Sequence, residues 1–309
     1  MPNQPADLAT YRMFLLLTAA AGFLFFIVSL REKKTGMLPA LVGLPLCLGL
    51  GFAFGKIFYV MLLRAEDVLE WGEWKQFLDF QPKFFCLMGG AAGATLGAWL
   101  AAKICRKDAK TVLDAFAVPG ALMIAGFRLA EIELDSIGRG RTLIDPKGFF
   151  SQAPFVLEGK WGQKVEAIFF WEALAALLVC FLALAEKENR AGMRFEKAVY
   201  RLCLCQILLE SMLSKSMRWG FVRVEMVLSA ALVLILVILA CWRKHKGWIA
   251  IPATLLMIGV VGVLEYARQK ASSAFLADYG YLLMGIGLAI TGLIYYLTVR
   301  EPETGTTEK

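Results

Sequence analysis

Residues 126–141 read Gly-Phe-Arg-Leu-Ala-Glu-Ile-Glu-Leu-Asp-Ser-Ile-Gly-Arg-Gly-Arg, at the end of a long apolar run. At helical spacing Arg128, Glu131 and Asp135 fall at positions i, i+3 and i+7, so a guanidinium and two carboxylates are expected on one helix face. Charges at the end of a hydrophobic segment are costly unless they are paired or hydrated. This stretch is therefore either a structural lock or a binding site.

The composition around this stretch is that of a membrane protein. The chain has 309 residues, of which 59% are hydrophobic and 19% charged, and its mean hydropathy is +0.62. About 18 apolar residues suffice to cross a bilayer, and we expect an all-α, polytopic integral membrane protein with about nine transmembrane helices. The spans are expected at 12–30, 38–63, 84–104, 111–131, 166–185, 197–213, 220–242, 248–267 and 277–299.

The spans are interpreted as one seven-helix core and an added C-terminal pair. The core comprises residues 1–242 and includes a segment outside the membrane at 132–165, and residues 243–309 form the pair with a polar tail. The net charge of +7 is attributed to topology and anionic lipid, because no basic cluster is interleaved with aromatic residues as nucleic-acid binding requires. One histidine and no Cys-x-x-Cys pattern argue against a metal centre, and no cofactor is expected.

The loops assign an orientation. Basic residues gather after the first, third, fifth and seventh expected spans, for example Arg31, Lys33 and Lys34 after the first. By the positive-inside rule these loops are cytoplasmic, which places the N-terminus outside and the C-terminus inside. The segment 132–165 then lies outside, although it is rich in arginine and lysine.

With this orientation, nine ionisable residues of the spans fall in the outer half of the membrane. Independent structural locks would be scattered through the depth, so the clustering predicts one polar cavity open to the outer face. The residues are Lys56, Arg128, Glu131, Glu166, Glu172, Glu210, Arg223, Glu225 and Glu265.

Five of these charged residues have two interpretations each. The fork of donors on Arg128 matches two phosphate oxygens, or the residue is held only by nearby acids. Glu131 is a general base or simply neutralises Arg128, and Glu210 is an orienting acceptor or a catalytic carboxylate. Lys56 and Arg223 are further phosphate contacts or partners of the acids.

Two glycine-containing segments have similar alternatives. Glycines recur every fourth residue from Gly89, which makes a smooth face for another helix. The pair Gly89 and Gly90 would also allow close approach of a ligand headgroup. Gly138 and Arg139 open a flexible, cationic segment that either receives an anionic headgroup or is a solvated loop.

Several motifs follow one another along the chain: Gly55-Lys56-Ile57-Phe58-Tyr59, Met88-Gly89-Gly90, Asp114 with Pro119, the 126–141 stretch, Gly138-Arg139-Gly140, Trp171-Glu172, Glu210-Ser211 and residues 220–229. In this order they resemble the pattern of the prolipoprotein diacylglyceryl transferase family over residues 10–240. The chain differs from the family pattern at Met88 in place of histidine, Glu131 in place of asparagine, Gln206 in place of arginine and Trp171 in place of tyrosine. A histidine base therefore cannot be carried over.

The family resides in the bacterial cytoplasmic (inner) membrane and serves lipoprotein biosynthesis. It moves diacylglyceryl from phosphatidylglycerol to the lipobox cysteine of preprolipoproteins at the outer face. The resemblance implies a monomeric transferase that acts within membrane lipid without cofactor, metal or nucleic acid, in which Arg128 holds the lipid phosphate. Glu131 and Glu210 complete the catalytic candidates. The implied substrate-binding residues are Lys56, Tyr59, Gly89, Gly90, Gly138, Arg139, Glu172 and Arg223.

Two other functions remain open. A relative that binds lipid or lipopeptide without catalysis is suggested by Met88 and Gln206. A small-solute transporter would also use buried charges, but the nine charges named above gather in the outer half of the membrane and no inverted repeat is visible.

Overall fold

The computed structural model places the chain in two compact units, residues 1–227 and 228–309. The division falls inside one helix and lies before residue 242, where the seven-helix core was expected to end. Asp135 lies outside the described residues. These are 5–63, 77, 81, 84–134, 138–143, 152–158, 162–186, 190–214, 218–219, 222–245, 247–270 and 274–299.

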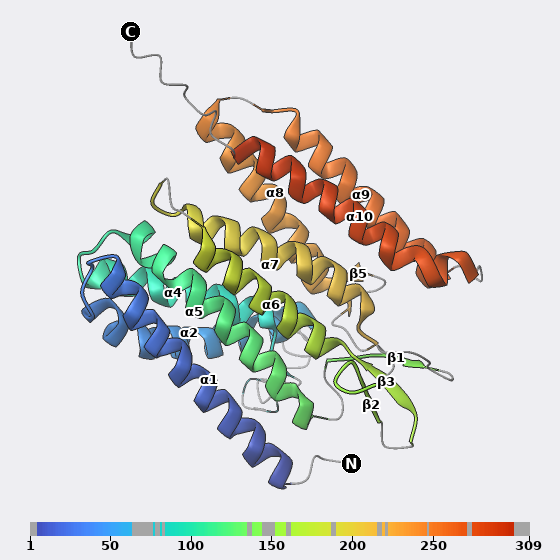
Figure 1. Cartoon of the computed structure of the whole chain (residues 1–309), viewed down its shortest axis with the longest axis horizontal. Coiled ribbons are helices and arrows are strands. Elements are labelled where there is room, and N and C mark those ends of the chain that lie inside the picture. Colours follow the sequence, from blue (N-terminus) through green and yellow to red (C-terminus); the bar gives the residue numbers. More distant parts are fainter. Residues whose placement is uncertain are drawn as a thin grey trace. The chain divides into compact units, whose positions relative to one another are not determined.

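Helices dominate both units, as expected, and each expected span overlaps one of them (Figure 1). Within the described residues, seven helices are long and apolar enough to cross a membrane. The other two are α4, which is rich in glycine, and α7, which carries several charges. The chain is therefore a multi-pass membrane protein. The helices are α1 (Pro5–Glu32), α2 (Leu38–Leu63), α4 (Leu87–Ile104), α5 (Ala109–Ala130), α6 (Ile168–Ala185), α7 (Met193–Met212), α8 (Val224–Lys244), α9 (Ala250–Lys270) and α10 (Ala274–Val299).

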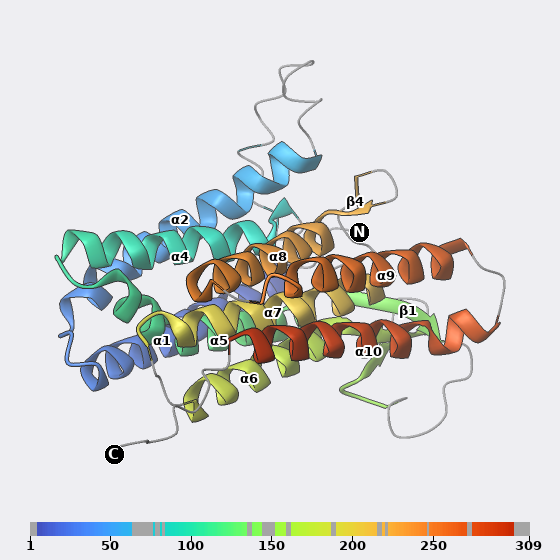
Figure 2. The same ribbon diagram turned by 90° about the horizontal axis from the view of Figure 1, so that it is seen from above.

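Helix α5 is the centre of the first unit. It packs against α1, α4, α6 and α7, while α2 runs along α4 (Figures 1 and 2). One apolar cluster, around Phe26 and Phe116, joins α5 to α1, α2 and α4. A second, around Val118 and Val179, joins α5 to α6 and α7. Residues 126–141 therefore begin in the central helix of the first unit.

Helices α2 and α4 approach closely because glycines face the contact. A Cβ atom at Gly97 would lie 2.6 Å from the backbone nitrogen of Cys47, and one at Gly93 would overlap the backbone of Leu50. At Gly90 the nearest atom would be 3.6 Å away. The smooth helix face predicted from the glycine repeat is thus confirmed.

An acid on α5 fixes the start of α7. The carboxylate of Asp114 accepts hydrogen bonds from the backbone N–H groups of Gly192 and Phe195. Gly192 is the N-cap residue and has a φ of 90°, a conformation that favours glycine. Asp114 therefore supplies the cap that the N-cap side chain cannot.

The start of α7 is also tied to the end of α6 by charge. Arg201 Nη2 lies 2.6 Å and Lys197 Nζ 3.4 Å from Glu186 Oε1. Burial alone would raise the pKa of the Glu186 carboxyl, but the hydrogen bond and charge of Arg201, together with Lys197, hold that pKa below its ordinary value.

A small sheet was not predicted. The segment 132–165 contains β1 (Arg139–Leu143) and β2 (Val156–Glu158), and β3 (Lys164–Ala167) leads directly into α6. The strands are antiparallel in the order β1-β3-β2. A second pair, β4 (Arg218–Trp219) and β5 (Val222–Arg223), joins α7 to α8. The first sheet thus sits where α5 ends and α6 begins.

The second unit contains most of α8 together with α9 and α10. Helices α9 and α10 pack against each other, with Val261 and Met284 buried. A Cβ at Gly287 would lie 3.2 Å from the side chain of Val261, which marks a close helix contact. Glu265 belongs to this unit and is buried.

Candidate functional site

Charged residues meet at one end of the first unit. This site end is formed by the last turns of α5 and α7 and by the first turns of α4, α6 and α8. Because α5 runs toward it and α6 runs away, residues distant in sequence come together there. The buried polar side chains that gather there are Arg128, Glu172, Gln206, Glu210, Arg223 and Glu225.

Arg128 is held between two glutamates. Its Nη1 donates to Glu131 Oε1 at 2.7 Å, and its Nε lies 3.0 Å from Glu172 Oε2. The side chains of Arg128, Glu131 and Glu172 are 8%, 12% and 3% exposed. The expectation that Arg128 and Glu131 share a helix face is confirmed, and α6 adds the second acid.

A second group links α4, α7 and α8. Glu225 Oε1 accepts from the Cys86 thiol at 3.2 Å and from the Leu87 backbone N–H at 2.9 Å. Gln206 Nε2 donates to Glu225 Oε2 at 3.1 Å and to Glu210 Oε2 at 3.3 Å. The thiol, amide and two carboxylates thus form one hydrogen-bonded chain.

Arg223 supports this chain through the backbone. Its Nη1 donates to the carbonyl oxygens of Glu210 and Leu213, the latter at 2.9 Å. A guanidinium bound to the last carbonyls of a helix also complements the helix dipole. Arg223 therefore secures the end of α7, where Glu210 projects into the site.

The two groups act on one another electrostatically. The charge of Glu225 affects Arg128, Glu131 and Glu172, and it also affects Glu210. The site thus brings together acids from α6, α7 and α8 with Glu131, which follows α5. This arrangement provides several carboxylates that can accept a proton and a guanidinium that can donate hydrogen bonds.

Gly138 lies directly against the site. A Cβ atom there would be 2.5 Å from Glu131 Oε2 and 2.6 Å from the Cβ of Phe169, and its φ is +67°. Both facts favour glycine at this position. The neighbouring Arg139 guanidinium lies 5.8 Å from the centre of the Phe169 ring, and its carbonyl accepts from the N–H and hydroxyl of Ser214.

Other predicted residues lie apart from the Arg128 contacts. Lys56 Nζ lies over the rings of Tyr59, Phe84 and Phe85, at 5.7, 5.3 and 5.5 Å from their centres. Glu166 is in β3 and pairs with the exposed Arg141 at 3.6 Å.

The glycine pair lies on the α2 contact. A Cβ at Gly89 would lie 2.7 Å from the carbonyl oxygen of Phe54, so this residue serves helix packing. Gly90 is less tightly enclosed, with its nearest atom on Gly51. Close approach of a ligand to this pair stays a prediction.

Two residues of the site, Cys86 and Glu225, were not among the predicted catalytic or substrate-binding residues. Cys86 is the N-cap of α4, accepts from the Gly89 N–H and donates to Glu225. Glu225 was noted only for its depth. A cysteine just before a Met-Gly-Gly helix start was the available signal, because N-cap side chains accept backbone N–H bonds.

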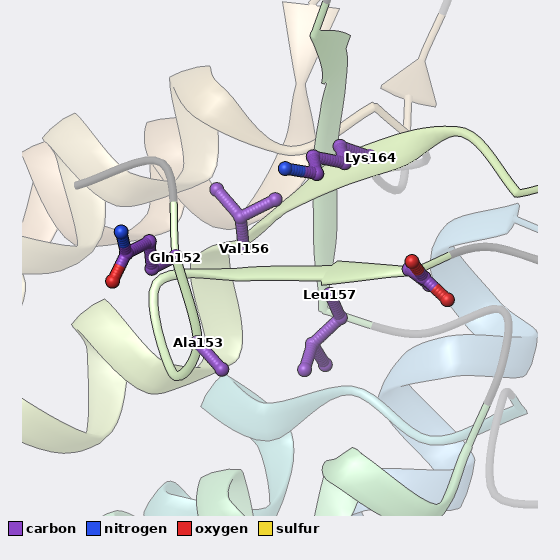
Figure 3. A pocket seen from close by; sticks show the side chains of 6 residues that line it. Gln152, Ala153, Val156, Leu157 and Lys164 are labelled. Carbon is purple, nitrogen blue, oxygen red and sulfur yellow. The ribbon is translucent and has the colours of Figure 1, made fainter. Parts of the chain in front are cut away.

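A shallow cavity of about 260 Å³ lies elsewhere, on the first sheet (Figure 3). It is lined by Gln152, Ala153, Val156, Leu157, Glu158 and Lys164, none of which was predicted as a site residue. Among the described residues, no group of three or more His, Cys, Asp or Glu side chains is arranged to hold a metal ion.

Comparisons with models of known protein families, with curated proteins and with solved structures find no match to this chain.

Proposed function

We propose that the chain transfers diacylglyceryl from phosphatidylglycerol to the lipobox cysteine thiol of preprolipoproteins. The observation that carries the proposal is the buried Arg128, set among glutamates from several helix ends. A guanidinium has five N–H donors. Its Nη2 makes no hydrogen bond to a described residue, so this group is the donor offered to a phosphate oxygen.

The chemistry is an alkyl transfer. The thiol sulfur attacks the glyceryl carbon that bears the phosphate ester; a C–S bond forms, the C–O bond breaks, and its electron pair leaves with glycerol phosphate. The thiol proton passes to a carboxylate of the site, for which the candidates are Glu131 and Glu172, in contact with Arg128, and Glu210, on α7. Hydrogen bonds from Arg128 stabilise the charge of the leaving phosphate.

The proposed setting is the bacterial cytoplasmic membrane. All nine helices would cross it, with the N-terminus outside, the C-terminus inside and the site end facing outward. The positive-inside distribution of the loops supports this orientation. A reporter attached within 152–158 should be labelled by a membrane-impermeant reagent added to intact cells, and labelling only after lysis would contradict it.

The direct test is transfer of labelled diacylglyceryl from phosphatidylglycerol vesicles to a lipobox peptide by the purified full chain. We expect transfer by the unmodified protein, and loss of about 100-fold or more in Arg128→Lys, because an ammonium lacks the fork and Nε contact. Arg141→Lys, on exposed β1, is the matched control and should retain activity. No transfer by a folded, lipid-bound protein would contradict the proposal.

One observation favours a second candidate, a non-catalytic relative that binds lipid or lipopeptide. Arg128 is already neutralised by Glu131 and Glu172, which weakens its attraction for a leaving phosphate. Met88, at the family histidine position, supplies no base. Binding of phosphatidylglycerol without transfer to any lipobox peptide would identify this candidate.

A further inference from the structure

The Arg128 site contains carboxylate oxygens that lack donors. Oε1 of Glu172 and Oε2 of Glu131 are buried and accept no hydrogen bond, whereas Oε2 of Glu172 is paired with Arg128 Nε at 3.0 Å. Glu172 as a whole is 5% exposed. Burying a carboxylate oxygen without a donor costs roughly 1–3 kcal/mol or more. These acceptors therefore favour a ligand that brings N–H or O–H groups.

The local charge favours a cation in particular. Arg128 is the cation in contact with both acids among the described residues, so the three side chains together carry one excess negative charge when ionised. Glu225 adds further negative potential to both acids. A neutral diol would supply donors but would not balance this charge.

The backbone leaves one of these oxygens uncovered by a side chain. Gly138 lies so close that a Cβ would be 2.5 Å from Glu131 Oε2. Any other residue at this point would press on that oxygen. The segment that follows α5 thus passes close to Glu131 Oε2 without displacing this acceptor or covering it with a side chain.

We propose that Glu131 and Glu172 form a receptor for a primary ammonium group, provided by the headgroup of an ethanolamine phospholipid. An ammonium has three donors and a compact charge, which match the donor-free oxygens and the excess negative charge. The phosphate of the same headgroup would be directed at Arg128 Nη2. The inference rests on the proposed function only in placing a phospholipid headgroup at Arg128; it adds that ethanolamine lipid competes with phosphatidylglycerol there.

The test uses the purified full chain in detergent micelles with a fluorescent phosphatidylglycerol bound. The fluorescent lipid is then displaced by short-chain phospholipids whose headgroups are ethanolamine, N-methyl-, N,N-dimethyl- and N,N,N-trimethylethanolamine. We expect affinity to fall stepwise along this series, by at least about tenfold in total, since each methyl removes a donor and a single charge-assisted hydrogen bond is already worth about that factor. Water-soluble phosphoethanolamine, as a separate arm, should displace far more weakly than the lipid.

Variants assign the preference to the two acids. Glu172→Gln and Glu131→Gln should each reduce the ethanolamine-over-choline ratio to within about twofold, because an amide has lost the charge that attracts the ammonium. Glu133→Gln, on the same turn as Glu131 but outside the Arg128 contact, is the matched control and should keep the full ratio. The methylation series on the unmodified protein needs no variant, so a variant that fails to fold does not decide the outcome.

The outcomes separate the two proposals. If phosphatidylglycerol binds to the protein but ethanolamine and choline lipids displace it equally well, only the ammonium receptor is overturned. An unchanged ratio in both folded glutamine variants would do the same. If no phospholipid binds at all, the placement of a headgroup at Arg128 fails, and the proposed function fails with it.

Discussion

Replacing Arg128 by Met should destabilise the first unit strongly, because it leaves two buried carboxylates without their cation. The pairs span 2.7 and 3.0 Å. At an effective dielectric constant of about 20 each is worth roughly 6 kcal/mol of Coulomb energy, before the desolvation of each ion removes several kcal/mol. Removing one partner of such a buried pair typically costs about 3–5 kcal/mol, and we expect a loss in that range.

The measurement is unfolding of the purified protein in mixed detergent micelles, followed by far-ultraviolet circular dichroism. Arg141→Met is the control: its pair with Glu166 is 3.6 Å long and Arg141 is 45% exposed, so we expect a loss of about 1 kcal/mol or less. Adding Glu131→Gln and Glu172→Gln to Arg128→Met should restore most of the stability. The reasoning is refuted if the Arg128 and Arg141 variants lose equal stability, or if the triple variant is no better than the single one.

Three further predictions concern elements away from Arg128. Asp114→Ala should lower the free energy of unfolding by about 1–2 kcal/mol, because α7 loses its cap. Far-ultraviolet circular dichroism during heating should then show unfolding at a lower temperature, and an unchanged unfolding temperature would contradict the cap. Gly93→Leu should abolish the close contact of α2 and α4 and prevent accumulation in membranes, whereas Gly90→Ala should accumulate normally; equal accumulation would contradict the packing. The stabilisation from Glu186 should be complete above the unfolded-state pKa of about 4.3 and fade as the pH falls through its lower folded-state pKa. Acid titration of Glu186→Gln should lack that component, and identical titrations would argue against the Arg201 pair.

The helices could be predicted because membrane insertion leaves a local signal. The expected span 38–63 coincides with α2, and the expected 111–131 nearly coincides with α5 (Ala109–Ala130). Apolar length and charged loops set these bounds without reference to tertiary contacts. The strands could not be found in this way, because β1 and β3 are short and are stabilised by pairing across the intervening segment.

The site was predictable only where its contacts are local. Arg128 and Glu131 meet because they are three residues apart on one helix. The approach of Glu172 depends on how α5 and α6 pack, which no spacing in the sequence encodes. The role of Lys56, as a phosphate contact or a partner of the acids, stays a prediction; its ammonium lies over the rings of Tyr59, Phe84 and Phe85.

The central claim is that the buried charges at the site end serve lipid modification of proteins. The measurement that tests it most directly is complementation of a bacterial strain depleted of its own diacylglyceryl transferase. We predict that the unmodified chain restores growth and lipoprotein modification, and that Arg128→Lys, present in the membrane at the same level, does not. Failure of the unmodified chain to restore either one, despite normal membrane insertion, would contradict the account.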